Sequence, residues 1–413
     1  MRQQKGPFQF LSAVFILTLT IGLLGVYYSK SDPSPPVNQI ALQEVREMLE
    51  PHLPIQKSLS STDLKLAEYP TPLVGKLTIN LDLQNSIESL LDRYKPDYAS
   101  VVAIHPKTGR ILALVDYVKK NDSRWKVKPL SLSATFPAAS VFKVVTAAAA
   151  LEEGGMKPDD KISFNGKSTT LYKSNLSQKI TRWTRWMTIE SAFAKSANPV
   201  FGKLGLYHIG GHSLQTYADR FGFNRAFDLD VSLSESRAEI PNEGYGVAES
   251  ASGFTRRTTL SPLQGAMIAS AIANHGKMMK PHLMESISDE DSKEVLYQAI
   301  HQKIAQPVSD RIATSLAGMM KKTIRTGTAR GSFRGFRRDP ILGKLEMGGK
   351  TGSLRGTEPQ GRYDWYIGYA VNEDDPSDQL AYSVMIINRK YWTVKSARLA
   401  RFFVKSYFKD RVD

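Results

Sequence analysis

Cysteine is absent from this chain of 413 residues, and histidine occurs only seven times. Without a thiol there is no disulfide framework, thiolate metal site, iron–sulfur cluster, cysteine nucleophile or acylated lipoprotein cysteine. The histidines form no His-Glu-x-x-His pair, and a glycine-rich phosphate loop is missing. We therefore expect neither a metal nor a cofactor, and an enzyme of this sequence has to use Ser, Thr, Lys or a carboxylate as nucleophile.

Acidic residues are outnumbered, with 40 Asp and Glu against 55 Lys and Arg and a formal net charge of +15. This balance favours anionic partners such as nucleic acid, lipid head groups or an acidic cell-wall polymer. Zinc-finger spacing and aromatic-rich basic motifs are both missing, so we expect no nucleic-acid partner. The hydrophobic content of 41% excludes a disordered or collagen-like chain.

A single long apolar run, residues 8–28, carries no charge and as a helix would span about 31 Å, close to a bilayer core. Arg2 and Lys5 precede it without an acidic residue, which predicts a cytoplasmic tail at 1–7 and an extracytoplasmic body. A cleaved signal peptide is the alternative. The run is long for a signal peptide and ends in Val-Tyr-Tyr rather than in small residues, so we predict a transmembrane anchor.

The body beyond the anchor alternates helical and strand patterns. Residues 29–75 are predicted to be a linker, stiff at 31–36, with a short helix at 39–50 and irregular structure to about Leu77. A very apolar helix should run from Pro137 to Leu151 in the centre of a domain. The other predicted elements are helices at 83–94, 262–276, 309–325 and 394–409, a hairpin at 100–117, and strands at 345–352, 365–371 and 380–389. This order predicts one large α/β domain at 76–413, whose sheet is assembled from distant segments.

The pattern Ser-x-x-Lys occurs three times, at Ser123–Lys126, Ser140–Lys143 and Ser406–Lys409. Only Ser140 begins the buried helix, where free N–H groups stabilise negative charge, and Lys143 lies one turn further on the same side. A lysine in so apolar a helix should have a lowered pKa, as a base that activates serine requires. The alternative is structural: Ser140 caps the helix and Lys143 extends its ammonium to solvent.

Ser196-Ala197-Asn198 precedes Pro199, which starts a new helix. This loop could present a hydroxyl and an amide to a cleft; alternatively, Asn198 only caps the helix. The similar Ser163-Phe164-Asn165 lacks the helix break, so we do not assign it to the site.

The third motif is Gly348-Gly349-Lys350-Thr351-Gly352-Ser353 on a late strand. Its glycines leave the strand open to a ligand backbone, while Lys350 and Thr351 offer a cation and a hydroxyl to a carboxylate. A second Lys-Thr-Gly, at 107–109, is interpreted as a hairpin turn.

In this order, Ser140-Val-Phe-Lys143, Ser196-Ala-Asn198 and Lys350-Thr-Gly352 resemble the transpeptidase domain of penicillin-binding proteins. Segments 77–84, 106–114, 259–264, 271–276 and 327–330 resemble it too, and the similarity covers about 76–409. The resemblance implies an antiparallel sheet between layers of helices and a bacterial inner-membrane protein with an extracytoplasmic catalytic domain. Its substrates would be peptidoglycan stem peptides, β-lactams would inhibit it covalently, and a separate glycan polymerase could cooperate with it.

The resemblance also implies a role for each matching residue. Ser140 would attack the bond between two terminal D-alanines, with Lys143 as base. Ser196 would relay a proton, and Asn198 would bind the substrate backbone and position Lys143. Lys350 and Thr351 would hold the terminal carboxylate beside Gly352, and N–H groups of Ser140 and Ser353 would form the oxyanion hole.

The sequence departs from the family pattern in Ala139, where glycine is frequent, and in Ser353, where threonine is commoner. About 45 residues separate the anchor from the domain, fewer than the pedestal or glycosyltransferase of larger members needs. A D,D-carboxypeptidase, a serine β-lactamase or β-lactam sensor, and a non-catalytic envelope scaffold remain open alternatives.

Overall fold

A computed structural model describes residues 38–53, 61–66, 71–119 and 129–412. The predicted cytoplasmic tail and anchor lie outside these residues. In the described part of the chain no helix has the length and apolar character that a membrane span requires.

The central element is a five-stranded antiparallel sheet in the order β13-β14-β15-β3-β4. Its strands are β3 (Tyr98–Ile104), β4 (Ile111–Val118), β13 (Leu345–Thr357), β14 (Gln360–Asn372) and β15 (Gln379–Asn388). β3 of the β3–β4 hairpin thus pairs with β15, which follows more than 200 residues later, and β15 joins the hairpin to β14 and β13, as the predicted assembly from distant segments requires. β13, which carries the glycine-rich motif, is an edge strand with one side free for a ligand.

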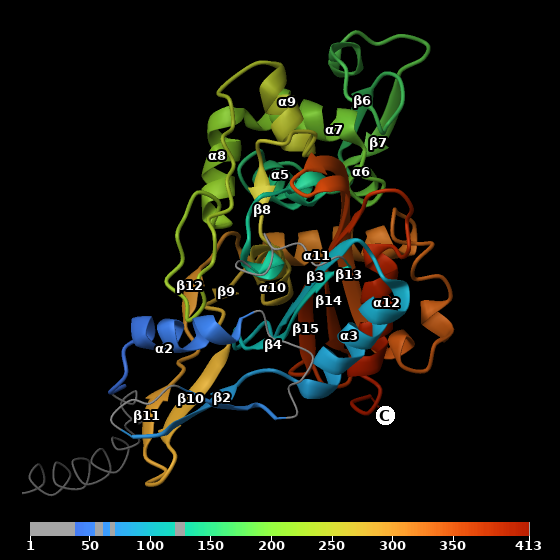
Figure 1. The fold of residues 1–413 in the computed structure, drawn as a ribbon. Coiled ribbons are helices and arrows are strands. Elements are labelled where there is room, and N and C mark those ends of the chain that lie inside the picture. Colours follow the sequence, from blue (N-terminus) through green and yellow to red (C-terminus); the bar gives the residue numbers. More distant parts are fainter. Residues whose placement is uncertain (1–37, 54–60, 67–70, 120–128, 413) are drawn as a thin grey trace, which may run out of the picture. The chain divides into compact units, whose positions relative to one another are not determined.

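Helices cover both faces of this sheet (Figure 1). On one face α3 (Leu81–Tyr94) and α12 (Ser396–Tyr407) lie side by side. On the other face α10 (Pro262–Ala273) and α11 (Asp310–Arg325) pack against the strands. The expected arrangement of an antiparallel sheet between helices is therefore present.

A helical layer beyond α10 and α11 surrounds the apolar α5 (Lys143–Glu152), which is buried almost throughout. The other members are α6 (Ile189–Ala194), α7 (Asn198–Lys203), α8 (Gly211–Arg220) and α9 (Tyr245–Ser252), with the hairpin β6 (Lys161–Phe164) and β7 (Arg185–Thr188) at its outer end. The central helix begins later than predicted: Phe136–Pro137 form the short strand β5, paired with β8 (Thr259–Leu260), and Ala139–Phe142 form a 3₁₀ turn.

The prediction of irregular structure up to Leu77 was wrong in two places. After α2 (Leu42–Leu49), β1 (Asp63–Lys65) and β2 (Leu73–Leu77) join β10 (Met284–Asp289) and β11 (Val295–Gln298) in a four-stranded sheet. One partner of β2, β10, is about 200 residues away, and the prolines between β1 and β2 made this segment look irregular in the sequence. A further pair joins β9 (Met278–Met279) to β12 (Lys303–Ala305).

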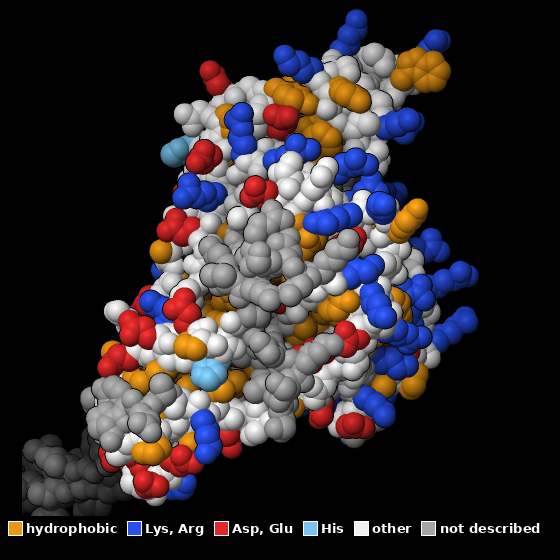
Figure 2. Space-filling model, viewed as in Figure 1, with side chains coloured by type: hydrophobic (Ala, Val, Ile, Leu, Met, Phe, Trp, Pro, Cys, Tyr) orange, Lys and Arg blue, Asp and Glu red, His pale blue; other side chains and the backbone are white. Residues whose placement is uncertain are grey.

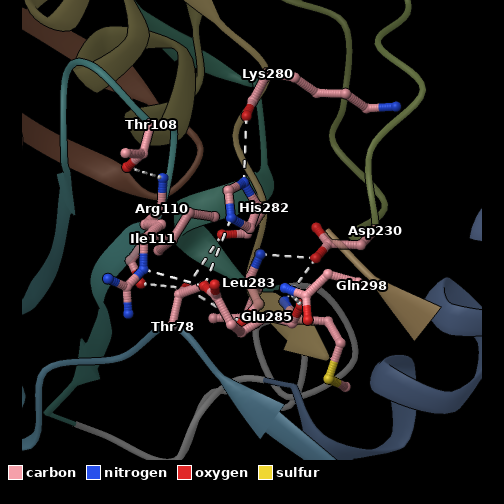
Figure 3. Close-up of polar contacts among 11 residues, drawn as sticks. Thr78, Thr108, Arg110, Ile111, Asp230, Lys280, His282, Leu283, Glu285 and Gln298 are labelled. Atoms are coloured by element: carbon pink, nitrogen blue, oxygen red, sulfur yellow. Dashed lines mark hydrogen bonds and ion pairs between the residues drawn. The ribbon is translucent and has the colours of Figure 1, made fainter. Parts of the chain in front are cut away.

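A set of buried polar contacts, which we call the polar joint, links this small sheet to the central one (Figure 3). The Thr78 hydroxyl lies 2.7 Å from the carbonyl oxygen of Ile111 in β4 and 3.2 Å from that of Leu283. Asp230 Oδ2 accepts hydrogen bonds of 2.7 Å from the N–H groups of Leu283 and Met284. Residues Ile40–Asp413 accordingly form one compact unit.

Candidate active site

Ser140 lies in the 3₁₀ turn at the head of α5, and its side chain does not cap the helix. The preceding Ala139 has a φ of +51°, in the left-handed region. Gly253, at the end of α9, packs against this turn: a Cβ at Gly253 would lie 2.0 Å from the Ala139 carbonyl oxygen. The nucleophile candidate is therefore held in a tight backbone turn that a neighbouring glycine accommodates.

Lys143 is fully buried, with 0% of its surface exposed, so its ammonium does not reach solvent. Its Nζ lies 2.7 Å from Ser140 Oγ, 2.8 Å from Asn198 Oδ1 and 2.5 Å from the carbonyl oxygen of Ser252. The alternative in which Ser140 caps and Lys143 extends outward is thus wrong, because the pair points inward and makes contact.

Burial lowers the pKa of Lys143 well below its ordinary value, and the nearby charge of Lys350 lowers it further. Asn198 Oδ1 and the Ser252 carbonyl can only accept hydrogen bonds, whereas the Ser140 hydroxyl can also donate one. A neutral amine has two N–H groups and one lone pair, which match these three partners. These partners accommodate the free base that the lowered pKa favours, and in that form the amine can accept the proton of the serine hydroxyl that it faces.

Ser196 and Asn198 lie at the junction of α6 and α7. Ser196 has a φ of +56°, which turns the chain between the two helices. Asn198 is the first residue of α7, and Ala197 is its N-cap, so the capping prediction for Asn198 was wrong. The Asn198 amide instead accepts from Lys143 and donates a 2.9 Å hydrogen bond to the carbonyl oxygen of Thr169.

Lys350 is also fully buried, in β13. Its Nζ donates to Ser196 Oγ at 3.0 Å and to the carbonyl oxygen of Thr351 at 2.8 Å, and lies 5.5 Å from the ring centre of Phe193. Burial lowers the pKa of Lys350 to about 7. Because charged and neutral forms are then both populated near neutral pH, this residue can serve as a cation or take part in proton transfer.

The glycines of β13 permit close packing on both sides of the strand. A Cβ at Gly352 would lie 3.1 Å from a methyl group of Val141, beside the nucleophile turn. Thr351 projects to the other face, where its hydroxyl lies 2.5 Å from that of Thr328. Side chains along β13 thus alternate between the Ser140 side and the face that carries α12.

One groove of about 500 Å³ joins these elements. Its walls include Ser140, Ser196, Asn198, Thr351, Gly352 and Ser353, with Lys143 and Lys350 behind Ser140 and Ser196. All eight residues proposed from the sequence therefore meet at one place. Their chemical roles stay predictions.

The competing motifs within the described residues lie away from the groove. Ser123 and Lys126 are outside the described residues, and Ser406 belongs to α12. Ser163 in β6 accepts a 3.2 Å hydrogen bond from Lys203, outside the groove. In the described part of the chain no group of three His, Asp or Glu side chains could hold a metal ion.

Sequence reasoning missed several groups at the groove. The carbonyl oxygens of Ser252 and Thr169 position Lys143 and Asn198, but a backbone carbonyl leaves no mark in a sequence. Thr328 belongs to one of the segments that resemble the family, yet its contact with Thr351 was not foreseen.

The sequence profile of the penicillin binding protein transpeptidase domain matches residues 99–404, about three quarters of the chain. This chain belongs to that family. The predicted resemblance is confirmed, and with it the family's α/β fold.

Relatives of this transpeptidase-domain protein are moderately similar. The peptidoglycan D,D-transpeptidase PbpA of Mycolicibacterium smegmatis is 29% identical over 310 residues, covering 68% of this chain and 60% of that protein. The stage V sporulation protein D of Bacillus subtilis is 27% identical over 341 residues, covering 75% and 50%. The chain thus spans between half and about three fifths of these relatives' length.

Solved structures share the fold. The penicillin G acyl-enzyme complex of penicillin-binding protein A from Mycobacterium tuberculosis superimposes with a TM-score of 0.62 at 24% identity, covering 80% of both chains. The D,D-transpeptidase domain of a peptidoglycan glycosyltransferase from Eggerthella lenta gives 0.64 at 22% identity, covering 82% of this chain and 83% of that one.

Proposed function

We propose that this protein is a peptidoglycan D,D-transpeptidase that cross-links stem peptides through an acyl-enzyme on Ser140. The observation that carries the proposal is the buried Lys143 amine, 2.7 Å from Ser140 Oγ, whose other two partners are acceptors. Two relatives support it by description: one is named a peptidoglycan D,D-transpeptidase, and another is described as a penicillin G acyl-enzyme complex.

In the acylation step, Ser140 Oγ attacks the carbonyl carbon between the two terminal D-alanines while its proton passes to Lys143 Nζ. The N–H groups of Ser140 and Ser353 stabilise the oxyanion that forms. Ser196 then passes a proton to the departing nitrogen, and the C–N bond breaks. Lys350 donates a hydrogen bond to Ser196 Oγ, so it can replace the proton that Ser196 passes on.

The terminal carboxylate of the donor peptide binds between Lys350, Thr351 and Ser353, with Gly352 leaving room for its backbone. β-Lactams carry a carboxylate at a comparable distance from a reactive carbonyl, so they acylate Ser140 by the same route. An amine of a second stem peptide resolves the acyl-enzyme as a cross-link, whereas water would make the protein a D,D-carboxypeptidase.

Fast hydrolysis, as in a serine β-lactamase, needs a base that activates water at the acyl-enzyme. Among the described residues that line the groove, the one carboxylate is that of Asp364. Its Oδ2 accepts the N–H of Ser396, on the α12 side. This arrangement favours a long-lived acyl-enzyme over a β-lactamase.

The proposed setting completes the assignment: a cytoplasmic tail at 1–7, an inner-membrane anchor at 8–28, a linker at 29–75 and an extracytoplasmic transpeptidase domain at 76–413. A separate glycan polymerase would supply the strands that the domain cross-links.

The test is to incubate the protein with a fluorescent penicillin and to follow the adduct by intact mass. We expect one adduct that persists for minutes, is lost in Ser140→Ala and is kept in the matched control Ser406→Ala. An adduct that disappears within seconds would identify a β-lactamase, and absence of any adduct would identify a scaffold. A stem pentapeptide with an amine acceptor then separates cross-linking from hydrolysis by product mass.

A further inference from the structure

The groove does not end at Ser353. Its lining continues across β14 and the segment before α12 to three residues that we call the cationic shelf: Arg362, Trp392 and Lys395. The guanidinium carbon of Arg362 and the Nζ of Lys395 each lie 5.4 Å from the ring centre of Trp392. Two positive charges therefore share one aromatic ring, which is 37% exposed.

The shelf has no direct anionic partner in the described part of the chain, where no carboxylate lies within ion-pair distance of Arg362 or Lys395. The nearby Asp364 accepts the N–H of Ser396 at 2.8 Å; burial raises its pKa to about 6, against the opposing effect of the Lys395 and Arg362 charges at longer range. Figure 2 shows Lys and Arg side chains concentrated along the side of the molecule that carries α12, with few acidic ones among them. The shelf is thus the positively charged end of the groove.

The strand register places a further positive charge beside the shelf. Arg355 of β13 stands directly opposite Arg362 of β14, and the carbonyl oxygen of Arg355 accepts a 3.0 Å hydrogen bond from Arg256 Nε. Like charges directly opposite each other destabilise an antiparallel pair. A bound anion would remove this cost, which marks the end of the hairpin as a place for an anionic ligand.

The face of the strand indicates which part of the reaction the shelf serves. Alternation places Thr351, Ser353 and Arg355 on one face of β13, and register places Asp364 and Arg362 on the same face. In the proposed function, Thr351 and Ser353 hold the carboxylate of the departing D-alanine. The shelf therefore lies on the leaving-group side, where the acceptor enters after the D-alanine has left.

We propose that the cationic shelf is an acceptor subsite, which binds a carboxylate of the incoming stem peptide and positions its amine. This inference rests on the proposed transpeptidase function and deepens it. The acceptor nitrogen forms a bond to the acyl carbon, the bond from that carbon to Ser140 Oγ breaks, and a proton from the amine returns to the serine by way of Lys143. Arg362 and Lys395 are positioning residues, since neither touches the reacting atoms.

Two carboxylates of an acceptor could supply the anion: one beside the attacking amine, as in a diaminopimelate side chain, or the C-terminal carboxylate of the peptide. The probes are therefore three tripeptide acceptors that contain diaminopimelate, one unmodified and two amidated at one of these positions. Each is offered to the full-length protein with a stem pentapeptide donor, and cross-linked and hydrolysed products are separated by mass.

In the wild type, amidation of the carboxylate that binds the shelf should lower the ratio of cross-linking to hydrolysis about tenfold, the usual scale of a charge-assisted hydrogen bond. In the double variant Arg362→Gln/Lys395→Gln, the ratio with the unmodified acceptor should fall about tenfold. The unmodified acceptor and the amidated one should then give the same ratio. The control Arg398→Gln removes an exposed positive charge from α12, and it should behave as the wild type.

Labelling by fluorescent penicillin distinguishes failure of the acceptor proposal from failure of the proposed function. If even the wild type is not labelled, the transpeptidase assignment fails. If the wild type is labelled but the double variant labels much more slowly, the shelf serves the donor and the acceptor proposal is overturned. It is likewise overturned if the labelled variant still discriminates the amidated acceptors as the wild type does.

Discussion

At the scale of single residues, the protonation of two buried lysines controls the proposed chemistry. Both side chains are fully buried, and they lie in the same site. Lys143 has partners that suit a neutral amine, whereas Lys350 lies beside Ser196, behind the groove wall where a carboxylate is proposed to bind. The site thus separates a base from a cation although both residues are lysines.

Replacing Lys143 with Arg should abolish acylation, because a guanidinium stays charged and cannot accept the proton of Ser140. We expect the rate of labelling by fluorescent penicillin to fall by about 10²–10⁴-fold, the range for loss of a general base. The matched control is Lys409→Arg, in the unrelated Ser406–Lys409 pair, which should label normally. Normal labelling of Lys143→Arg would rule out Lys143 as the base.

The pH profile of acylation should report on Lys350. Its pKa of about 7 means that the side chain is charged below that pH and loses its charge as pH rises. A substrate carboxylate would then bind more weakly, so the acylation rate by a carboxylated β-lactam should fall on the alkaline side. Lys350→Arg keeps its charge, so this decline should disappear; a profile with the same alkaline decline would contradict the assignment.

The sequence allowed prediction of the reactive side chains but not of their supports. Ser140, Ser196 and Lys350 could be found because each stands in a short motif on a recognisable element. The carbonyl oxygen of Ser252 and the conformation of Gly253 could not, because both depend on how α9 packs against the nucleophile turn. Such contacts arise only from tertiary structure.

At the scale of elements, the junction between α9 and the nucleophile turn leaves no room for a side chain at Gly253. Gly253 has a φ of +62°, and a Cβ there would collide with the backbone of Ala139. Gly253→Ala should therefore displace Ser140, slow acylation about tenfold or more, and destabilise the fold by about 1–3 kcal/mol. Kinetics of β-lactam labelling and thermal melting measure both effects.

The control for this change is Gly155→Ala. Gly155 has the same φ of +62° but nothing within 4 Å of an added Cβ. It should lose some stability through backbone strain yet keep its acylation rate. Equal rates in the two variants would show that the contact with Ala139 does not position the nucleophile.

Helices were easier to predict than strands. α3, α10, α11 and α12 follow apolar periodicity and end signals that are local in sequence. β13 and β14 each extend five residues beyond their predicted boundaries at the hairpin end, because most side chains there are polar or exposed. Apolar patterning marks only the part of a strand that lies in the core.

At the scale of the whole molecule, Asp230 makes the polar joint sensitive to pH. Burial raises its pKa to about 6, from 3.8 in an unfolded chain. The folded state therefore binds the proton of the Asp230 carboxyl more tightly than the unfolded state does. The stability that this proton contributes is complete below pH 3.8 and is lost as pH rises through about 6. The full change is about 3 kcal/mol, at about 1.4 kcal/mol for each unit of pKa.

Asp230→Asn keeps an oxygen that can accept the N–H groups of Leu283 and Met284 but has no proton to lose. The free energy of unfolding of this variant, minus that of the wild type, should increase as pH rises from 4 to 7. Urea denaturation at pH 4, 5, 6 and 7 measures this difference. A constant difference across the four pH values would contradict the raised pKa.

The order of strands in the central sheet has a consequence for biosynthesis. A ribosome makes β3, β4 and the Ser140 turn first, whereas β13, which carries Lys350, and β15, which pairs with β3, follow more than 200 residues after Ser140. While those residues are being added, the nascent chain holds Ser140 without Lys350, and such non-local pairing makes folding slow. Reactivity toward penicillin should switch on late and all at once, as a property of the finished polypeptide.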